Sequence, residues 1–199
     1  MTLNRRHAGL GLAAAILAAI GLYTNLGAKP AAAGPNMVYL PDGPARPRPA
    51  ALDAFWAEAK TAKPGLGDDY EVRWFGVDAK TTTGIFNHIR TDNKHGTFTL
   101  PWILEKNSQP VTKVGTLLTL IDYDGAPTMV LRITGNETVT FGAIDERVTG
   151  LDGPPVRNVE VWKPVHRNFW NGELKKYGLM VTDDMPVLVE RFELVYTRP

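Results

Sequence analysis

The closing run from Pro186 to Tyr196 constrains the fold more than any other part of this 199-residue chain. Its apolar and charged side chains fall into two alternating sets, which is the pattern of a strand with two distinct faces. Val187, Val189, Arg191, Glu193 and Val195 alternate with Leu188, Glu190, Phe192, Leu194 and Tyr196. We expect this last strand to pair with strands from the middle of the sequence, so that the sheet is built by long-range pairing.

The rest of the chain supplies helices and further strands. Apolar spacing predicts helices over 52–63, 78–91 and 159–177, with Asp78 as the cap of the second. In the third we expect Trp162, Val165, Phe169 and Leu174 to be buried. Strands are predicted over 70–75, 97–100, 114–123, 128–134 and 137–141, with a hairpin at 124–127. This order favours an α+β fold, a small barrel with helices packed outside it.

The N-terminus is typical of an exported protein. Arg5 and Arg6 precede an apolar run over 8–23, and Ala31 and Ala33 offer a small-residue cleavage site, which together predict an export signal over 1–33. An uncleaved membrane anchor over 8–28 is the alternative. In either case we expect the domain outside the cytoplasm, periplasmic or secreted, or anchored to the membrane. Five prolines in 34–50 predict an extended tether, so that the domain spans 51–199.

Composition excludes several kinds of site. The chain has no cysteine, and its four histidines show no metal-ligand spacing, so we expect no metal and no cofactor. Residues 1–50 contain five basic residues and one acidic residue, a net of +4, whereas the remainder has 17 basic and 20 acidic residues, a net of −3. A mildly acidic domain disfavours long duplex nucleic acid, although it allows a pocket for a single nucleotide.

The segment from Asn93 to Trp102 offers the most chemistry. Lys94 and Thr97 stand three residues apart where a turn enters a short strand, so that Lys94 is expected to overhang the polar face with Thr97 and Thr99. A lysine beside a hydroxyl suits a site that grips a polar substrate or activates a nucleophile. The plain alternative is a solvated strand end with a surface lysine.

The order of motifs along the chain resembles the ASCH family, a small β-barrel related to the PUA domains of RNA-modifying proteins. The resemblance covers about residues 52–196. It rests on Trp74-Phe75-Gly76, Lys94-x-x-Thr97, Trp162-x-x-x-His166-x-x-Phe169 and Met185-Pro186-Val187-x-x-Glu190-Arg191-Phe192. It implies a mostly antiparallel PUA-like barrel. Catalytic members act on nucleic-acid material, either as amidohydrolases that deacylate a modified cytidine or as ribonucleases.

The resemblance also implies catalytic residues. The family motif Gly-Lys-Lys-x-Ala-Thr-x-Ser corresponds to residues 92–99, which keep Lys94 and Thr97 but replace the glycine with Asp92 and the first lysine with Asn93. The family's Glu-Gly-Glu-Gly-Asp run corresponds to 152–156. Asp152 stands there in place of the glutamate, and Pro154 removes the second acid. The candidate catalytic set is therefore Lys94, Thr97 and Asp152.

Five further residues are candidates for ligand binding. His88 and His95 are alternative proton carriers, Thr99 shares the face of Thr97, and Trp102 offers a ring for base stacking. Each also has an ordinary structural role open to it. Glu190 and Arg191 point to opposite faces of the last strand, so that one of them faces the interior.

Three functions remain open from the sequence. The leading one is an exported ASCH-like domain with a pocket for a small polar ligand, a nucleoside or a short RNA by resemblance. The first alternative is a hydrolase, acting on an amide or a phosphodiester. The second is an envelope interaction module that has lost its chemistry. Contact with a membrane is expected only through residues 8–28, if they are not cleaved.

Overall fold

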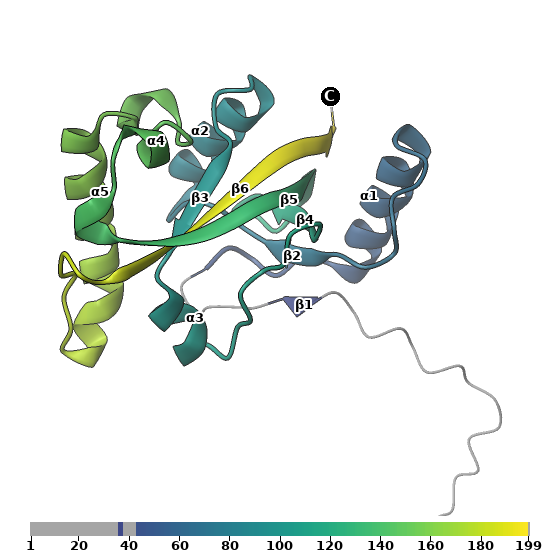
Figure 1. Cartoon of the computed structure of the whole chain (residues 1–199). Coiled ribbons are helices and arrows are strands. Elements are labelled where there is room, and N and C mark those ends of the chain that lie inside the picture. Colours follow the sequence, from purple (N-terminus) through teal and green to yellow (C-terminus); the bar gives the residue numbers. More distant parts are fainter. Residues whose placement is uncertain (1–35, 38–42, 199) are drawn as a thin grey trace, which may run out of the picture. The chain divides into compact units, whose positions relative to one another are not determined.

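A computed structural model describes residues 36–37 and 43–198 (Figure 1). It contains one six-stranded sheet in the order β1-β2-β4-β5-β6-β3. The strands are β1 (Asn36–Met37), β2 (Glu71–Arg73), β3 (Gly96–Thr99), β4 (Leu117–Ile121), β5 (Pro127–Thr140) and β6 (Pro186–Thr197). β1, β2 and β4 run parallel, and the other neighbouring pairs are antiparallel. The mixed α+β class is as expected.

The closing strand pairs with two earlier segments, as its alternation predicts. β6 lies between β5 and β3, with Glu190 opposite both Asn136 and Thr97. The two strands predicted over 128–134 and 137–141 are one continuous strand, β5, because a register shift at Ile133/Gly135 absorbs the irregular residues without ending the pairing.

The expectation of a closed barrel is wrong for the part of the chain that the structure describes. The sheet is open, with β1 at one edge and β3 at the other. β3 is only four residues long, and Pro101 begins the helix α3 (Pro101–Lys106) immediately afterwards. A strand this short offers few backbone groups for a second pairing, and a proline at that point favours a helix start.

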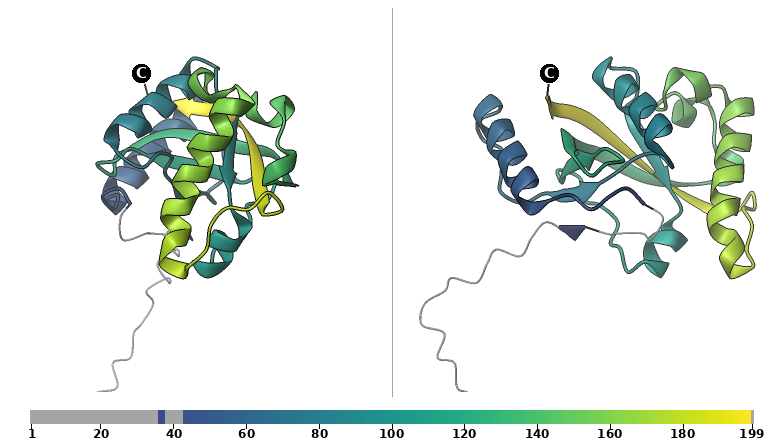
Figure 2. Two further views of the ribbon diagram at one scale, coloured as in Figure 1. Left: turned by 90° about the vertical axis from the view of Figure 1, so that its left-hand side faces the viewer. Right: turned by 180° about the vertical axis from the view of Figure 1, so that it is seen from behind.

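Helices cover both faces of the sheet (Figures 1 and 2). The others are α1 (Pro49–Ala62), α2 (Ala79–Arg90), α4 (Glu146–Thr149) and α5 (Val159–Leu174), with short 3-10 turns at Phe141–Ala143, Pro154–Val156 and Lys175–Tyr177. Asp78 caps α2 as predicted, because its side chain accepts from the Thr81 amide at 2.7 Å. The first helix starts at Pro49, two residues before the expected start of the domain.

The three larger clusters of the described core lie between the sheet and its helices. α1 packs Phe55 and Trp56 over one end, and α2 packs Phe86 and Ile89 over residues such as Phe192. α5 packs against the third part, through its own residues Trp162, Trp170 and Leu174 together with Phe98, Phe141, Val187 and Val189.

The predicted buried face of the last helix is half right. Trp162 and Leu174 are buried, but Val165 and Phe169 are 47% and 42% exposed. The inward row runs through Trp162, His166, Trp170 and Leu174, four residues apart each time, so positions 165 and 169 fall on the outer side.

The predicted export signal and most of the tether lie outside the described residues. Among the helices that the structure does describe, none is long and apolar enough to cross a membrane.

Candidate functional site

Lys94 and Asp152 meet although 58 residues separate them. Lys94 follows a turn in which Asp92 takes the left-handed conformation, with a φ of 58°. The loop that carries Asp152 is fastened to this turn, because the His95 and Gly96 amides both donate to the Leu151 carbonyl, at 2.8 and 3.0 Å. A side chain at Gly96 would meet the Leu151 side chain at 2.8 Å, so the glycine allows this close approach.

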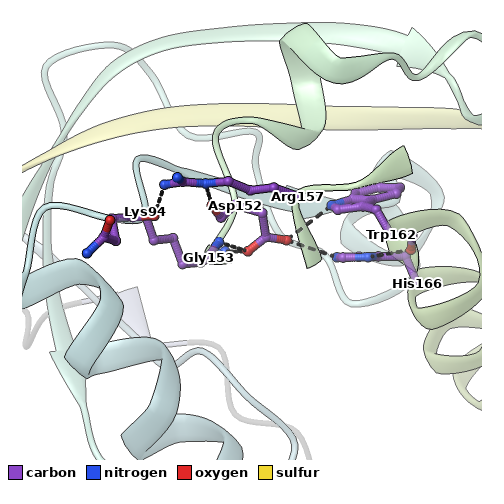
Figure 3. Close-up of polar contacts among 7 residues, drawn as sticks. Lys94, Asp152, Gly153, Arg157, Trp162 and His166 are labelled. Carbon is purple, nitrogen blue, oxygen red and sulfur yellow. Dashed lines mark hydrogen bonds and ion pairs between the residues drawn. The ribbon is translucent and has the colours of Figure 1, made fainter. Parts of the chain in front are cut away.

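The Asp152 carboxylate is surrounded by donors (Figure 3). Its Oδ1 accepts from the Lys94 Nζ and from the Gly153 amide at 2.7 Å. Its Oδ2 accepts from the Trp162 Nε1 at 3.1 Å and lies 3.7 Å from the His166 Nε2. Lys94 and Asp152 are 6% and 5% exposed, so this is a buried ion pair whose carboxylate is held on both oxygens.

Burial lowers the pKa of both basic groups beside Asp152. Desolvation lowers the pKa of His166 to about 4, against the opposing effect of Asp152, so the imidazole is neutral near pH 7. Its Nδ1 lies 3.0 Å from the Trp162 carbonyl, which can accept a proton held there, and its ring stacks on Trp162 with centroids 3.6 Å apart. Desolvation also lowers the pKa of Lys94, while Asp152 opposes that shift.

Arg157 ties the two segments together and was missed by sequence reasoning. Its Nε donates to the Asp152 carbonyl at 2.8 Å, and its Nη2 donates to the Asn93 carbonyl (Figure 3). Both acceptors are backbone atoms, which leave no trace in the identity of the residues that provide them. We call the group of Lys94, Asp152, Arg157, Trp162 and His166 the Asp152 cluster.

Thr97 does not join Lys94 and Asp152. Phe98 packs edge-on against Trp162, with centroids 4.9 Å apart, and the Lys94 Nζ lies 5.5 Å from the centre of the Phe98 ring. Lys94 is therefore on the Phe98 side of β3, and the alternation of the strand points Thr97 to the opposite side. The expectation that Lys94 overhangs the polar face is wrong, because the docked loop draws its side chain into the core.

A second polar group lies on the Thr97 side of the sheet. Glu190, opposite Thr97 on β6, is 1% exposed, and its Oε2 lies 3.3 Å from the Arg73 Nη1. Its Oε1 is buried and has no hydrogen-bond partner among the described residues. Arg73 also bonds Glu71 at 3.2 Å and the Thr112 hydroxyl. We call Arg73, Thr97, Thr112 and Glu190 the Glu190 cluster.

Sequence reasoning selected Glu190 but missed Arg73 and Thr112. Glu71 and Arg73 alternate with the buried Val72 on β2, which pairs with strands on both sides. A charged residue that alternates with a buried one on an inner strand is the pattern that could have identified Arg73.

The remaining candidates are scattered. The His88 ring lies against Gly153, where an added Cβ would be 2.8 Å from its Cδ2, so His88 borders the Asp152 cluster. His95 instead turns outward, with its Nε2 3.1 Å from the Asp92 carbonyl. Thr99 shares the face of Thr97 on β3. Trp102, on α3, packs edge-on against Tyr177 beside a hollow of about 10 Å³, room for no more than a water molecule.

These positions limit the chemistry that the described residues can perform as they stand. General base catalysis needs a base within hydrogen-bond reach of the nucleophile. The Asp152 carboxylate is instead engaged by Lys94, Gly153 and Trp162, and Thr97 faces away from it. No group of three metal-ligating side chains occurs among the described residues.

Comparisons with known proteins agree with the open, helix-flanked sheet. A family model described as the ASCH domain matches residues 71–196, well over half of the chain, and this protein therefore belongs to the ASCH domain family. No curated protein matches the chain.

Two solved structures show the same fold. The ASCH domain from Lactobacillus crispatus JV V101 is 20% identical, with a TM-score of 0.67, over 74% of this chain and 95% of that one. A protein from Enterococcus faecalis V583 is 19% identical, with a TM-score of 0.66, over 73% of this chain and 88% of that one.

Proposed function

We propose that this ASCH domain binds a small polar ligand, of the nucleoside or short RNA class, at the Glu190 cluster. The observation that carries the proposal is the buried Glu190 Oε1, which has no partner among the described residues. A buried acceptor without a donor costs about 1–3 kcal/mol, and a ligand that supplies an N–H or O–H group recovers that free energy.

The neighbouring groups suit a ligand edge that carries both donors and acceptors. Glu190 accepts hydrogen bonds and the Arg73 guanidinium donates them. The Thr97 hydroxyl, which bonds no other described residue, can do either. The edge of a nucleobase presents such a pattern. Arg73 is 20% exposed and Glu190 1%, so a movement of Arg73 is the step by which a ligand would reach the carboxylate.

A small ligand fits this domain better than a long duplex. The net charge of −3 over residues 51–199 provides no basic track for a phosphate backbone. The PUA-like fold of the family, often linked to RNA, supports a nucleoside or a short single strand. Export of the domain remains a proposal that rests on residues 1–33.

Hydrolysis by Lys94, Thr97 and Asp152 has less support. The lowered pKa of Lys94 suits a base, but its Nζ is bonded to Asp152, and Thr97 lies on the other side of β3. A catalytic step would require the Asp152 loop to leave its place.

Calorimetric titration of the full chain with the four common ribonucleosides and with short oligoribonucleotides tests the proposal. We expect at least one of them to bind, and Glu190→Gln to weaken it at least tenfold. The matched control is Glu193→Gln, on the same strand, whose exposed side chain pairs with Arg132 at 2.7 Å. Lys94→Met is included because it removes the catalytic lysine of the hydrolase alternative.

Three outcomes would contradict the proposal. One is the absence of binding by every ligand tested, and another is equal weakening by Glu190→Gln and Glu193→Gln. The third is cleavage of an oligoribonucleotide that stops in Lys94→Met while circular dichroism shows that variant still folded, which would favour the hydrolase instead.

A further inference from the structure

A short segment of chain lies against the Glu190 cluster. Residues 110–114, which we call the strap, connect α3 to β4 and form neither a helix nor a strand. Thr112, at the middle of the strap, is 1% exposed, whereas Val111 and Val114 are 47% and 60% exposed. The strap therefore contacts the domain through one inward side chain, and its apolar neighbours face outward.

The two ends of the strap are held by backbone hydrogen bonds. The Gln109 amide donates to the Leu104 carbonyl at 2.8 Å and closes the end of α3. The Gly115 amide donates to the Ile133 carbonyl of β5, also at 2.8 Å. Apart from a tight turn at the C-terminal end of the strap, all its hydrogen bonds to other described residues involve Thr112. Loss of the Thr112 bonds would therefore release the middle of the strap and leave both ends in place.

Thr112 is bonded to two residues that flank Glu190. Its carbonyl accepts from the Asn136 Nδ2 at 2.6 Å, and Asn136 on β5 is paired with Glu190 on β6. Paired residues of antiparallel strands lie on the same face of the sheet. The Thr112 hydroxyl accepts from Arg73, whose Nη1 lies 3.3 Å from the Glu190 Oε2. We call the bonds from Thr112 to Asn136 and to Arg73 the latch.

The Glu190 cluster lies close to solvent beneath the strap. Asn136 and Thr138, which point to this face of β5, are exposed, whereas the paired Glu190 is 1% exposed. Solvent thus reaches the neighbour of Glu190 but not its carboxylate. A movement of the strap together with Arg73 would open a short route from solvent to that carboxylate.

Arg73 has a second carboxylate to which it can turn. Its Nη2 lies 3.2 Å from the Glu71 Oε2, and the Glu71 side chain is 24% exposed, against 1% for Glu190. Glu71 and Arg73 are two positions apart on β2, so both side chains point to the same face. When Thr112 moves away, Arg73 keeps an ion pair with Glu71, so that opening leaves no arginine charge without a partner.

We propose that the strap is a gate over the Glu190 cluster, which the latch closes in the free protein and which opens to admit the ligand. The identity of that ligand rests on the proposed function. Because the ligand binds the open form, the closed strap lowers its apparent affinity by the fraction of molecules that are open. Loss of one latch bond should raise that fraction about fivefold, the factor that corresponds to the net free energy of one hydrogen bond.

Tighter binding by latch variants is therefore the result that identifies a gate. Asn136→Ala and Thr112→Val each remove one latch bond, and we expect each to bind a ribonucleoside about fivefold more tightly than the wild type in calorimetric titrations of the full chain. Thr138→Ala is the matched control, because this exposed residue on the same face of β5 forms no bond to the strap. It should leave the affinity unchanged. The gate is overturned if either latch variant binds no more tightly than the wild type.

Thiol labelling tests the opening of the strap without a ligand, because the natural chain has no cysteine. Thr112→Cys and Glu190→Cys place a thiol at positions that are 1% exposed. Thr119→Cys is the control, at a fully buried position on the inner strand β4 whose hydroxyl has no hydrogen-bond partner among the described residues. We expect the first two to react about a hundredfold faster than the control, since local opening requires less free energy than unfolding. Adding Asn136→Ala should speed both about fivefold and leave the control unchanged.

The labelling separates failure of the gate from failure of the proposed function. The gate is overturned if Glu190→Cys reacts as slowly as Thr119→Cys, or if Asn136→Ala does not change its rate while circular dichroism shows both variants folded. Labelling as expected, without binding by any ribonucleoside or short oligoribonucleotide, would support the opening of the strap and contradict the nucleoside class of ligand.

Discussion

The two polar clusters on either side of β3 each contain a buried carboxylate beside a basic side chain. They differ in how many of the carboxylate oxygens are hydrogen-bonded. In the Asp152 cluster the chain supplies a donor to each carboxylate oxygen. In the Glu190 cluster one carboxylate oxygen, equally buried, has none among the described residues. Since native proteins satisfy nearly all buried polar atoms, the first cluster is suited to hold the fold, and the second is where a partner beyond the described residues is expected.

The largest expected effect tests whether the Asp152 cluster stabilises the fold. Lys94→Met leaves the Asp152 carboxylate buried without its cation, and loss of one partner from a buried pair destabilises by about 3–5 kcal/mol. Urea unfolding followed by circular dichroism measures the change. The double variant Lys94→Met/Asp152→Asn should recover part of the loss, because it leaves no unpaired buried charge and the single amide oxygen still accepts from one of the two donors, Gly153 or Trp162.

The exposed pair of Lys60 and Asp68 provides the control. Lys60→Met should change the free energy of unfolding by less than about 1 kcal/mol, as surface pairs do. If Lys94→Met costs no more than Lys60→Met, the Asp152 cluster does not hold the fold in solution.

Acid should weaken the same cluster through His166. Its folded pKa of about 4 lies below the ordinary value of 6.5, so the unfolded chain binds more protons between those values, and stability falls as the pH drops from 6.5 to 4. The full difference corresponds to roughly 3 kcal/mol. Unfolding free energies of the wild type and His166→Gln, measured from pH 7.5 to 4, should differ in slope in that window.

His95→Gln is the matched variant for this titration, since its ring lies on the surface. Parallel pH profiles for the wild type and His166→Gln would show that His166 is not buried in its neutral form, and would remove this part of the contrast between the clusters.

Much of the fold could be predicted from periodicity, because burial imposes it on local sequence. The closing strand, the cap at Asp78 and the inward positions Trp162 and Leu174 follow from spacing alone. The exposure of Val165 and Phe169 could not be predicted from spacing. An apolar residue at helical spacing indicates the core even where the structure places it on the outer side.

The candidate site was harder to predict, for a physical reason. Its arrangement depends on the docking of the Asp152 loop, which is fixed by backbone hydrogen bonds to Leu151 and by Arg157 on two carbonyls. The backbone groups in these contacts are the same whichever residues carry them, so they leave no pattern in the sequence. Residue types indicated Lys94 and Thr97, and the family resemblance added Asp152, but neither showed which side of β3 each would occupy.

The smallest expected effect on stability is the sharpest test of the comparison. Glu190→Gln keeps the size of the side chain, and Arg73 retains Glu71 and Thr112 as partners. We therefore expect the free energy of unfolding to change by less than about 1 kcal/mol, since the wild-type carboxylate already leaves one oxygen without a bond. A loss as large as that of Lys94→Met, in the same urea experiment, would mean that Glu190 holds the fold as Asp152 does. A stable variant that no longer binds would instead separate the two clusters by role, because Glu190 would then be needed for binding and not for stability.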